Sequence, residues 1–209
     1  MYLPRHFEQT NPAALRALIH DHPLATLVTL GSEGLDANFV PLLLIEEAGK
    51  IYLRGHVARA NPVWMCTRDS SEALAVFRGP DAYVSPSWYP SKTETGKVVP
   101  TWAYMAVLAR GMLRIKDEGR WVRQVVETLT MQHEAGRTPP WAVADAPADY
   151  MDAMVKAIVG IEIEVSNLQG KWKLCQDDGP RDCAGVAAGL REDGTKIPVA
   201  MADLIERGT

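Results

Sequence analysis

Three short apolar segments, separated by tight turns, constrain the fold of this chain more than any other feature. They cover residues 25–30, 37–46 and 51–56, and the turns between them contain Gly31, Gly34 and the pair Ala48-Gly49. Segments of this length with such short connections are typical of consecutive antiparallel strands. The sequence therefore predicts a three-strand meander that begins an antiparallel sheet or barrel.

The rest of the chain predicts both strands and helices. Asn11-Pro12 and Asn61-Pro62 are typical helix starts, because asparagine caps the first turn and proline suits its first position. We expect one α+β domain over residues 1–209, with a β-barrel core, peripheral helices and a helical C-terminal extension. The expected further strands are 73–79, 103–116, 160–166 and, after a turn at Gly170, 171–176; the expected helices are 12–20, 61–67, 120–134, 147–159 and 199–207.

Composition and missing motifs exclude several classes of protein. The net charge of −4 offers no general basic field for nucleic acid, so DNA is a poorly supported partner. The three cysteines have no CxxC spacing, which argues against a disulfide framework and a zinc site. His133-Glu134 lacks the second histidine of a zincin helix, and no phosphate-binding glycine loop or serine-nucleophile motif occurs. Without an apolar leader or a membrane-length segment, we expect a cytoplasmic protein with no membrane partner.

Residues 53–62, LRGHVARANP, combine features that suit a phosphate group. Gly55 permits an unusual turn, Arg59 offers a forked cation, and Asn61-Pro62 begins a helix with free amides. A solvated loop with an ordinary helix cap is the alternative. The segment from Tyr83 to Tyr104 holds five of the aromatic residues, which either fill a core or line a planar ligand.

Five blocks in a fixed order give the chain a family resemblance. MYLPRHF, LRGHVARANP, YVSPSWYPSK, VPTWAY and GKWKLCQ, which together span nearly the whole chain, resemble the FMN-binding negative transcriptional regulators of the PaiB type. The resemblance implies an antiparallel, Greek-key-like split β-barrel related to pyridoxamine-phosphate oxidases and flavin reductases. It also implies a homodimer with FMN at the subunit interface, and a role in repressing genes.

The resemblance also suggests which residues hold FMN. Arg59 stands where the fold has its phosphate arginine, with Asn61 beside it, and Lys92 is a second cation unless it is a plain surface lysine. His56 faces the ribityl chain or ring, or is a buried structural histidine. The expected cofactor-binding set is Asn38, Val40 and Pro41 along the ring, His56, Arg59, Asn61, Lys92, Thr101 and Trp102 in the pocket wall, and Lys173 and Gln176 from the partner subunit.

This chain departs from the family pattern at several positions near the expected site. Ala103 replaces an asparagine, Cys175 and Asp177 stand where the family reads serine and asparagine, and Cys183 replaces an arginine. Asp177 adds a negative charge that would be unfavourable near a flavin phosphate. These changes predict that the protein binds FMN weakly or uses a related ligand.

Three functions are compatible with these observations. The first is an FMN-binding regulator or sensor with no catalytic residue of its own. The second is a flavin oxidoreductase using NAD(P)H, in which FMN supplies the chemistry. The third is a haem-binding split-barrel protein, with His56 or His133 as the iron ligand.

Overall fold

The computed structural model describes residues 1–32, 34–66, 71–193 and 196–207, which form an α+β fold. Its strands are β1 (Glu8–Gln9), β2 (Leu24–Gly31), β3 (Gly34–Pro41), β4 (Leu43–Glu47), β5 (Lys50–Ala58), β6 (Ser71–Val84), β7 (Thr101–Lys116) and β8 (Ile158–Lys173). Its α-helices are α1 (Pro12–Asp21), α2 (Val63–Cys66), α3 (Lys92–Thr95), α4 (Gly119–Glu134), α5 (Ala148–Lys156), α6 (Pro180–Glu192) and α7 (Lys196–Arg207). Short 3₁₀ helices lie at η1 (Arg5–Phe7), η2 (Pro86–Trp88) and η3 (Val143–Asp145).

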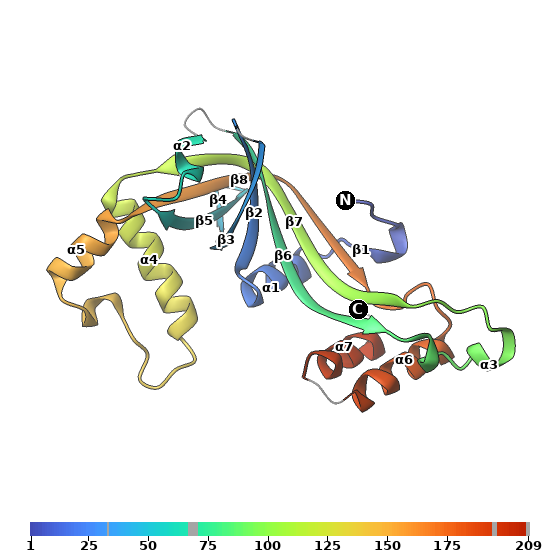
Figure 1. The fold of residues 1–209 in the computed structure, drawn as a ribbon. Coiled ribbons are helices and arrows are strands. Elements are labelled where there is room, and N and C mark those ends of the chain that lie inside the picture. The colour runs from blue at the N-terminus through green and yellow to red at the C-terminus, as the bar shows by residue number, and fades with distance from the viewer. Residues whose placement is uncertain (33, 67–70, 194–195, 208–209) are drawn as a thin grey trace. The chain divides into compact units, whose positions relative to one another are not determined.

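The strands form a single sheet within the described residues. Their hydrogen-bonded order is β3-β2-β6-β7-β8-β5-β4, and β1 pairs with the end of β8 (Figure 1). The pairs β2–β3, β2–β6, β4–β5, β5–β8 and β1–β8 are all antiparallel. The predicted antiparallel start of the sheet is confirmed, because β2 and β3, and then β4 and β5, form successive hairpins.

The second segment of the predicted meander is two strands, not one. The backbone N–H of Leu42 donates to the carbonyl of Pro23 (2.9 Å), so the ladder is interrupted after Pro41 and β4 begins at Leu43. This partner is distant in sequence, and apolar periodicity alone continues unbroken through residues 37–46.

The predicted turn at Gly170 is wrong, because β8 continues through it to Lys173. Gly170 is required by packing instead: a Cβ there would lie 2.2 Å from Leu15 Cδ2 and 3.0 Å from the carbonyl of Gln9. The helix predicted over 147–159 is also shorter than expected. It ends at Lys156 because the chain enters β8 at Ile158.

The chain divides into two compact units. The central unit consists of Ile19–Phe77 and Leu108–Leu168, and the terminal unit consists of Met1–Leu18, Arg78–Val107 and Gln169–Thr209. The prediction of a single domain therefore stays a prediction. The largest fully buried side chains of the central unit include Leu27, Leu53, Phe77, Leu113, Ile161 and Ile163, and those of the terminal unit include Val84, Leu190 and Met201.

In the central unit, α4 covers β4 and β5. Val125 and Leu129 of this helix pack on Leu43, with Ile45 and Trp121 at the edge of the cluster. The predicted apolar face of this helix is confirmed. Gly160 of β8 leaves room for Trp121, because a Cβ there would lie 2.4 Å from the indole ring.

In the terminal unit, α6 and α7 lie side by side (Figure 1). Gly185 and Gly189 lie one turn apart on α6, and η2 packs against them. A Cβ on Gly189 would lie 2.2 Å from Trp88 Cγ, and one on Gly185 would lie 2.3 Å from the Trp88 carbonyl. Trp88 is therefore a packing residue, and Tyr89 is buried beside it. None of the helices in the described ranges is long and apolar enough to cross a membrane.

Candidate functional site

Two neighbouring hollows of the terminal unit share Thr101, Trp102, Lys173 and Asp177. We call the first the acidic hollow; its volume is about 310 Å³, and it is also lined by Val84, Tyr89, Ser91, Lys97, Val98, Val99, Ala103, Cys175, Asp178 and Asp182. We call the second the aromatic hollow; its volume is about 710 Å³, and it is also lined by Tyr2, Pro4, His6, Phe7, Pro100, Tyr104 and Lys171.

Three predicted cofactor-binding residues meet between these hollows. Thr101 and Trp102 begin β7, Lys173 ends β8, and the two strands are hydrogen-bonded neighbours. The Lys173 ammonium donates to the hydroxyl of Thr101. Trp102 is 54% exposed, and its indole meets Tyr83 edge to face at 5.9 Å. The arrangement presents a cation, a hydroxyl and an aromatic wall to the same space.

The acidic hollow favours protonated groups. Burial, followed by the charge of Asp177, raises the pKa of Asp178 above its usual range. The Tyr89 hydroxyl donates to Asp178 Oδ2 (3.3 Å), and burial, followed by the Asp178 charge, raises the pKa of Tyr89. Asp182 accepts from the backbone N–H of Ser91 (3.0 Å). An acidic, partly buried wall of this kind disfavours an anionic ligand on this side.

Cys175, which lines the acidic hollow, and its neighbour Cys183 are not activated nucleophiles. Burial, followed by the Asp178 charge, raises the pKa of the Cys175 thiol to about 12. The pKa of Cys183 is raised by the same two causes, and its thiol donates to the Cys175 carbonyl (3.1 Å). Cys175 has a left-handed backbone (φ 64°), which is strained for a residue with a side chain. Across the residues that the structure describes, no cluster of three or more His, Cys, Asp or Glu side chains could hold a metal ion.

Lys92 and Gln176 do not line either hollow. Lys92 donates to Ser87 Oγ (3.3 Å). The exposed Gln176 accepts from the N–H of Leu174 (2.6 Å) and donates to the carbonyl of Trp172 (2.7 Å), so its amide holds the turn after β8. Their cofactor roles stay predictions.

The central unit holds the other predicted residues. Asn61 Nδ2 donates to Asn38 Oδ1 (2.7 Å), and Asn61 Oδ1 accepts from the N–H of Val63 (3.0 Å). Val40 and Pro41 pass close over Gly55, where a Cβ would lie 2.6 Å from the Pro41 carbonyl. Because α2 has only four residues, it offers no strong N-terminal dipole to a phosphate.

Arg59 is held in place by several acceptors. Its Nε donates to the carbonyl of Lys156 (2.7 Å), and its Nη atoms donate to both oxygens of Asp117 (2.5 and 3.1 Å). Hydrogen bonding from Arg59 lowers the pKa of Asp117. The guanidinium also lies 5.9 Å from the centroid of Trp64, so its position is fixed but a carboxylate already occupies its fork.

His56 points away from the Val40–Pro41 crossing. Gly55 meets that crossing, and successive residues of a strand alternate between its two faces. Desolvation lowers the pKa of His56, and its Nδ1 is buried without a hydrogen-bond partner among the described residues. A neutral imidazole with an unused polar atom could take a ligand or a water.

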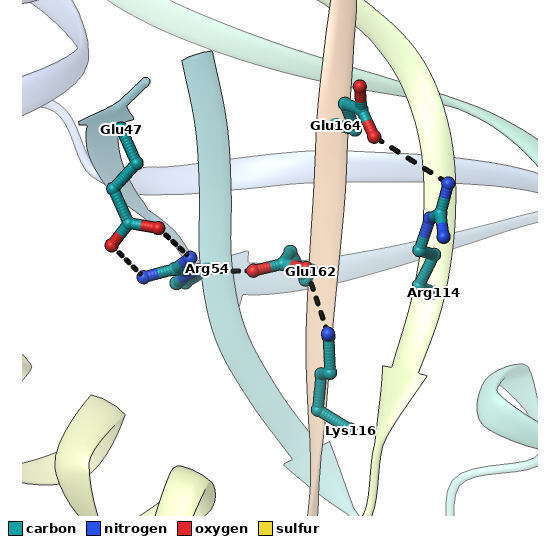
Figure 2. A network of polar contacts seen from close by, with 6 residues as sticks. All are labelled: Glu47, Arg54, Arg114, Lys116, Glu162 and Glu164. Carbon is teal, nitrogen blue, oxygen red and sulfur yellow. Dashed lines mark hydrogen bonds and ion pairs between the residues drawn. The ribbon is translucent and has the colours of Figure 1, made fainter. Parts of the chain in front are cut away.

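The same face of β5 and β8 carries an ion-pair network (Figure 2). Arg54 Nε donates to Glu162 Oε2 (2.7 Å), and Glu162 Oε1 also meets the Lys116 ammonium (3.1 Å). Arg54 forms two further bonds with Glu47 (both 2.8 Å). Each cation here faces a carboxylate, so the network connects β4, β5, β8 and β7 but leaves little charge for a ligand.

Sequence reasoning missed Lys171, Asp178 and Tyr89 as pocket residues. Lys171 had a usable signal, because it lies two residues before Lys173 on one strand and therefore on the same face. Tyr89 and Asp178 are 89 residues apart, and no local pattern relates them.

Comparisons with known proteins give a family model and several similar chains. The family model described as "Putative FMN-binding domain" matches residues 1–167. The uncharacterized protein AN0679 of Emericella nidulans is 33% identical over 245 aligned positions, covering 100% of this chain and 98% of that protein. Protease synthase and sporulation protein PAI 2 of Bacillus subtilis is 28% identical, covering 99% of this chain and 97% of that one, which confirms the predicted resemblance.

A solved structure shares the fold. It is that of the FAD and heme binding protein from Mycobacterium smegmatis, with a TM-score of 0.59 and 18% identity, covering 87% of this chain and 80% of that chain. At this identity the likeness concerns the fold alone. Together with the antiparallel sheet, it confirms the predicted α+β split β-barrel.

Proposed function

This chain belongs to the FMN-binding domain family, and we propose that it binds FMN as a single split-barrel domain with a helical C-terminal extension. We further propose a homodimer of the PaiB type, with FMN at the subunit interface, that acts as a flavin-dependent regulator or sensor. The observation that supports this most is the family match, because residues 1–167 contain the hydrogen-bonded pair of Asn38 and Asn61 as well as Thr101 and Trp102. When bound, FMN would supply electron or hydride transfer.

The Arg59 guanidinium suits the phosphate of FMN. The Arg59 and Asp117 side chains are 40% and 49% exposed, and exposed ion pairs contribute little to stability. A phosphate monoester carries a charge of about −1.5 to −2 at neutral pH, so it competes well with one carboxylate for a guanidinium fork. The backbone bonds from Arg59 to Lys156 and Ile158 would remain and keep the fork oriented.

The ring and ribityl chain have suitable partners too. Trp102 offers an exposed aromatic face, and Thr101 and Lys173 offer a hydroxyl and an ammonium. His56 Nδ1 is a buried polar atom that gains a partner if the ligand reaches it. In the proposed dimer, each flavin takes residues from both protomers, with Lys173 and Gln176 coming from the partner.

An uncovered apolar sheet face supports the homodimer. In the central unit, Leu24, Leu30, Leu35 and Phe39 are 62–79% exposed. The register places Leu30 opposite Leu35 and Phe39 opposite Thr26, so these side chains share one face of the β2–β3 hairpin. An apolar patch of this kind on a sheet is typical of a protein interface, and a second copy offers the same patch about a two-fold axis.

Titration with FMN tests the phosphate assignment through two opposite substitutions. Arg59→Ala removes the fork and should weaken FMN binding by about tenfold or more, because a bidentate charge-assisted contact is lost. Asp117→Asn removes the competing carboxylate and should tighten FMN binding severalfold. Neither change should alter the affinity for riboflavin, which lacks the phosphate.

Flavin fluorescence quenching measures both affinities. Glu127→Gln serves as a control, because Glu127 is an exposed carboxylate of α4 in the same unit and belongs to neither the Arg59–Asp117 pair nor the Asn38–Asn61 pair. Unchanged FMN affinity in Arg59→Ala, or weaker FMN binding in Asp117→Asn, would contradict the assignment of the phosphate to Arg59.

Haem binding is the second candidate, because within the described structure His56 Nδ1 is buried without a hydrogen-bond partner. Desolvation lowers the pKa of His56, and neutral imidazole is the form that ligates iron. Haem would give the purified protein a Soret band that His56→Ala abolishes.

Reduction of bound flavin by NADH or NADPH would instead identify an oxidoreductase, whereas the regulator proposal expects no turnover with these reductants.

A further inference from the structure

Lys171 is a buried cation without a carboxylate partner in the described part of the chain. It is 8% exposed and lies on β8 opposite Glu8 of β1. Its ammonium donates one hydrogen bond, to the carbonyl of Tyr2 (3.2 Å). Three rings surround it, with centroids 5.6 Å (Tyr2), 5.8 Å (Phe7) and 5.4 Å (Tyr104) from Nζ.

The aromatic rings compensate only part of the burial of this charge. A cation over an aromatic face is attracted to it, but the ammonium has three N–H donors, of which one is used within the described residues. A buried charge is normally completed by an opposite charge or further hydrogen bonds. Lys171 therefore has capacity for an anion.

Lys173 strengthens this anion preference. It lies two residues further along β8, on the same face, and it lines the aromatic hollow together with Lys171. The only carboxylate that lines this hollow in the described structure is that of the exposed Asp177, and no ion pair joins it to either lysine there. Among the residues that line this hollow, two ammonium groups accompany one carboxylate; Lys173 also lines the acidic hollow, so Lys171 carries most of the anion preference.

The rest of the hollow fits a flat ring. Its walls come from the N-terminal segment (Tyr2, His6 and Phe7) and from the start of β7 (Trp102 and Tyr104). Its volume of about 710 Å³ lies within the range of roughly 300–1,000 Å³ that small-molecule sites occupy. Aromatic walls accept the faces or edges of a planar ligand.

We propose that the aromatic hollow binds a planar aromatic acid, whose anionic group is held by Lys171 and Lys173. This inference rests on the proposed function, in which Thr101, Trp102 and Lys173 contact the flavin, and it names the class of anion that the hollow takes. The acid group belongs either to a separate aromatic carboxylate or to FMN, whose phosphate would then lie at the two lysines instead of at Arg59. Both have the chemistry that two ammonium groups recognise.

Two matched ligand pairs distinguish these sources in the full-length protein. One pair is 2-aminobenzoate and the uncharged 2-aminobenzamide, and the other is FMN and riboflavin. Affinities are measured by fluorescence titration for the wild type, Lys171→Met, Lys171→Arg and the control Lys50→Met. Lys50 is an exposed lysine of β5 in the central unit, and its substitution removes the same charge.

The wild type should bind one acid at least about tenfold more tightly than its uncharged counterpart, as expected for a charge-assisted contact. Lys171→Met should abolish that preference, whereas Lys171→Arg and Lys50→Met should keep it. Loss of the 2-aminobenzoate preference assigns the hollow to a separate acid, and loss of the FMN preference assigns it to the flavin phosphate.

The inference is overturned if the wild type shows neither preference, or if Lys171→Met retains it. Lys171→Arg keeps the charge and so separates loss of the contact from a folding effect. A misfolded Lys171→Met protein would bind neither the acid nor its uncharged counterpart. If FMN binds but Lys171→Met changes neither preference, this inference fails and the proposed function stands. If no flavin binds but the 2-aminobenzoate preference depends on Lys171, the proposed function fails instead.

Discussion

Asp178, in the acidic hollow, has surroundings that favour its protonated form. Burial is the main cause of its raised pKa, the neighbouring Asp177 adds to it, and the hydrogen bond from Tyr89 opposes it. An acid whose pKa is higher in the folded state destabilises the fold once it ionises. Its stabilising contribution is therefore present below the unfolded pKa and is lost as the pH rises through the folded pKa.

We expect Asp178→Asn to have a higher melting temperature than the wild type at pH 7, because the variant cannot ionise. The advantage should shrink as the pH falls towards about 4, where the unfolded carboxylic acid is also protonated. Differential scanning calorimetry at several pH values measures this. A variant that melts below the wild type at pH 7 would show that the Tyr89 hydrogen bond outweighs the burial of the charge.

Residue roles were harder to predict than residue environments. The sequence indicated Arg59 as a cation after a strand, but its partner Asp117 lies 58 positions away and no local pattern links them. Thr101, Trp102 and Lys173 were selected through the family resemblance, and the structure brings them together in the terminal unit. Lys92 and Gln176 came from the same resemblance, but they make local contacts outside the hollows.

At the scale of elements, the ion-pair network of Figure 2 joins strands whose side chains share one face. Glu162 and Glu47 both bind Arg54, but their side chains are 8% and 52% exposed. Removal of a buried partner leaves a desolvated charge behind, whereas removal of an exposed one is compensated by water.

We expect Glu162→Ala to lower the free energy of unfolding by roughly 2–4 kcal/mol, since Arg54 and Lys116 both lose a buried acceptor. Glu47→Ala is the matched control and should cause a much smaller loss. Urea denaturation of both variants measures the difference. Equal losses would show that burial of Glu162 does not determine the strength of the network.

Strands were predicted correctly where consecutive segments pair as hairpins. They were predicted incorrectly where contacts between residues distant in sequence set the strand boundaries. The β2–β3 and β4–β5 hairpins follow alternation and turn residues. The break at Leu42 depends on Pro23, and β8 continues through Gly170 where it pairs with β1, with Gln9 opposite Gly170. Glycine within a strand was read as a turn, although close packing demands it there.

At the scale of the whole molecule, the proposed dimer depends on the apolar face of the β2–β3 hairpin. Phe39 is 76% exposed among the residues that the structure describes. Phe39→Glu places a charge on that face, and burying it unpaired would be unfavourable. We expect this variant to be monomeric by light scattering at concentrations where the wild type is dimeric.

Met131→Glu is the control for this experiment, because Met131 of α4 is 67% exposed and lies outside the hairpin. It should remain dimeric. A dimer that survives Phe39→Glu, or one that Met131→Glu dissociates, would move the interface away from this face.

The most direct test of FMN binding is the visible absorbance of the purified protein, followed by release and identification of the chromophore. The account predicts the two-banded spectrum of an oxidised flavin, release of FMN on denaturation, and binding of added FMN by the stripped protein. A protein that is colourless and does not bind added FMN would contradict it. A Soret band without flavin would contradict it as well and would assign the fold to haem.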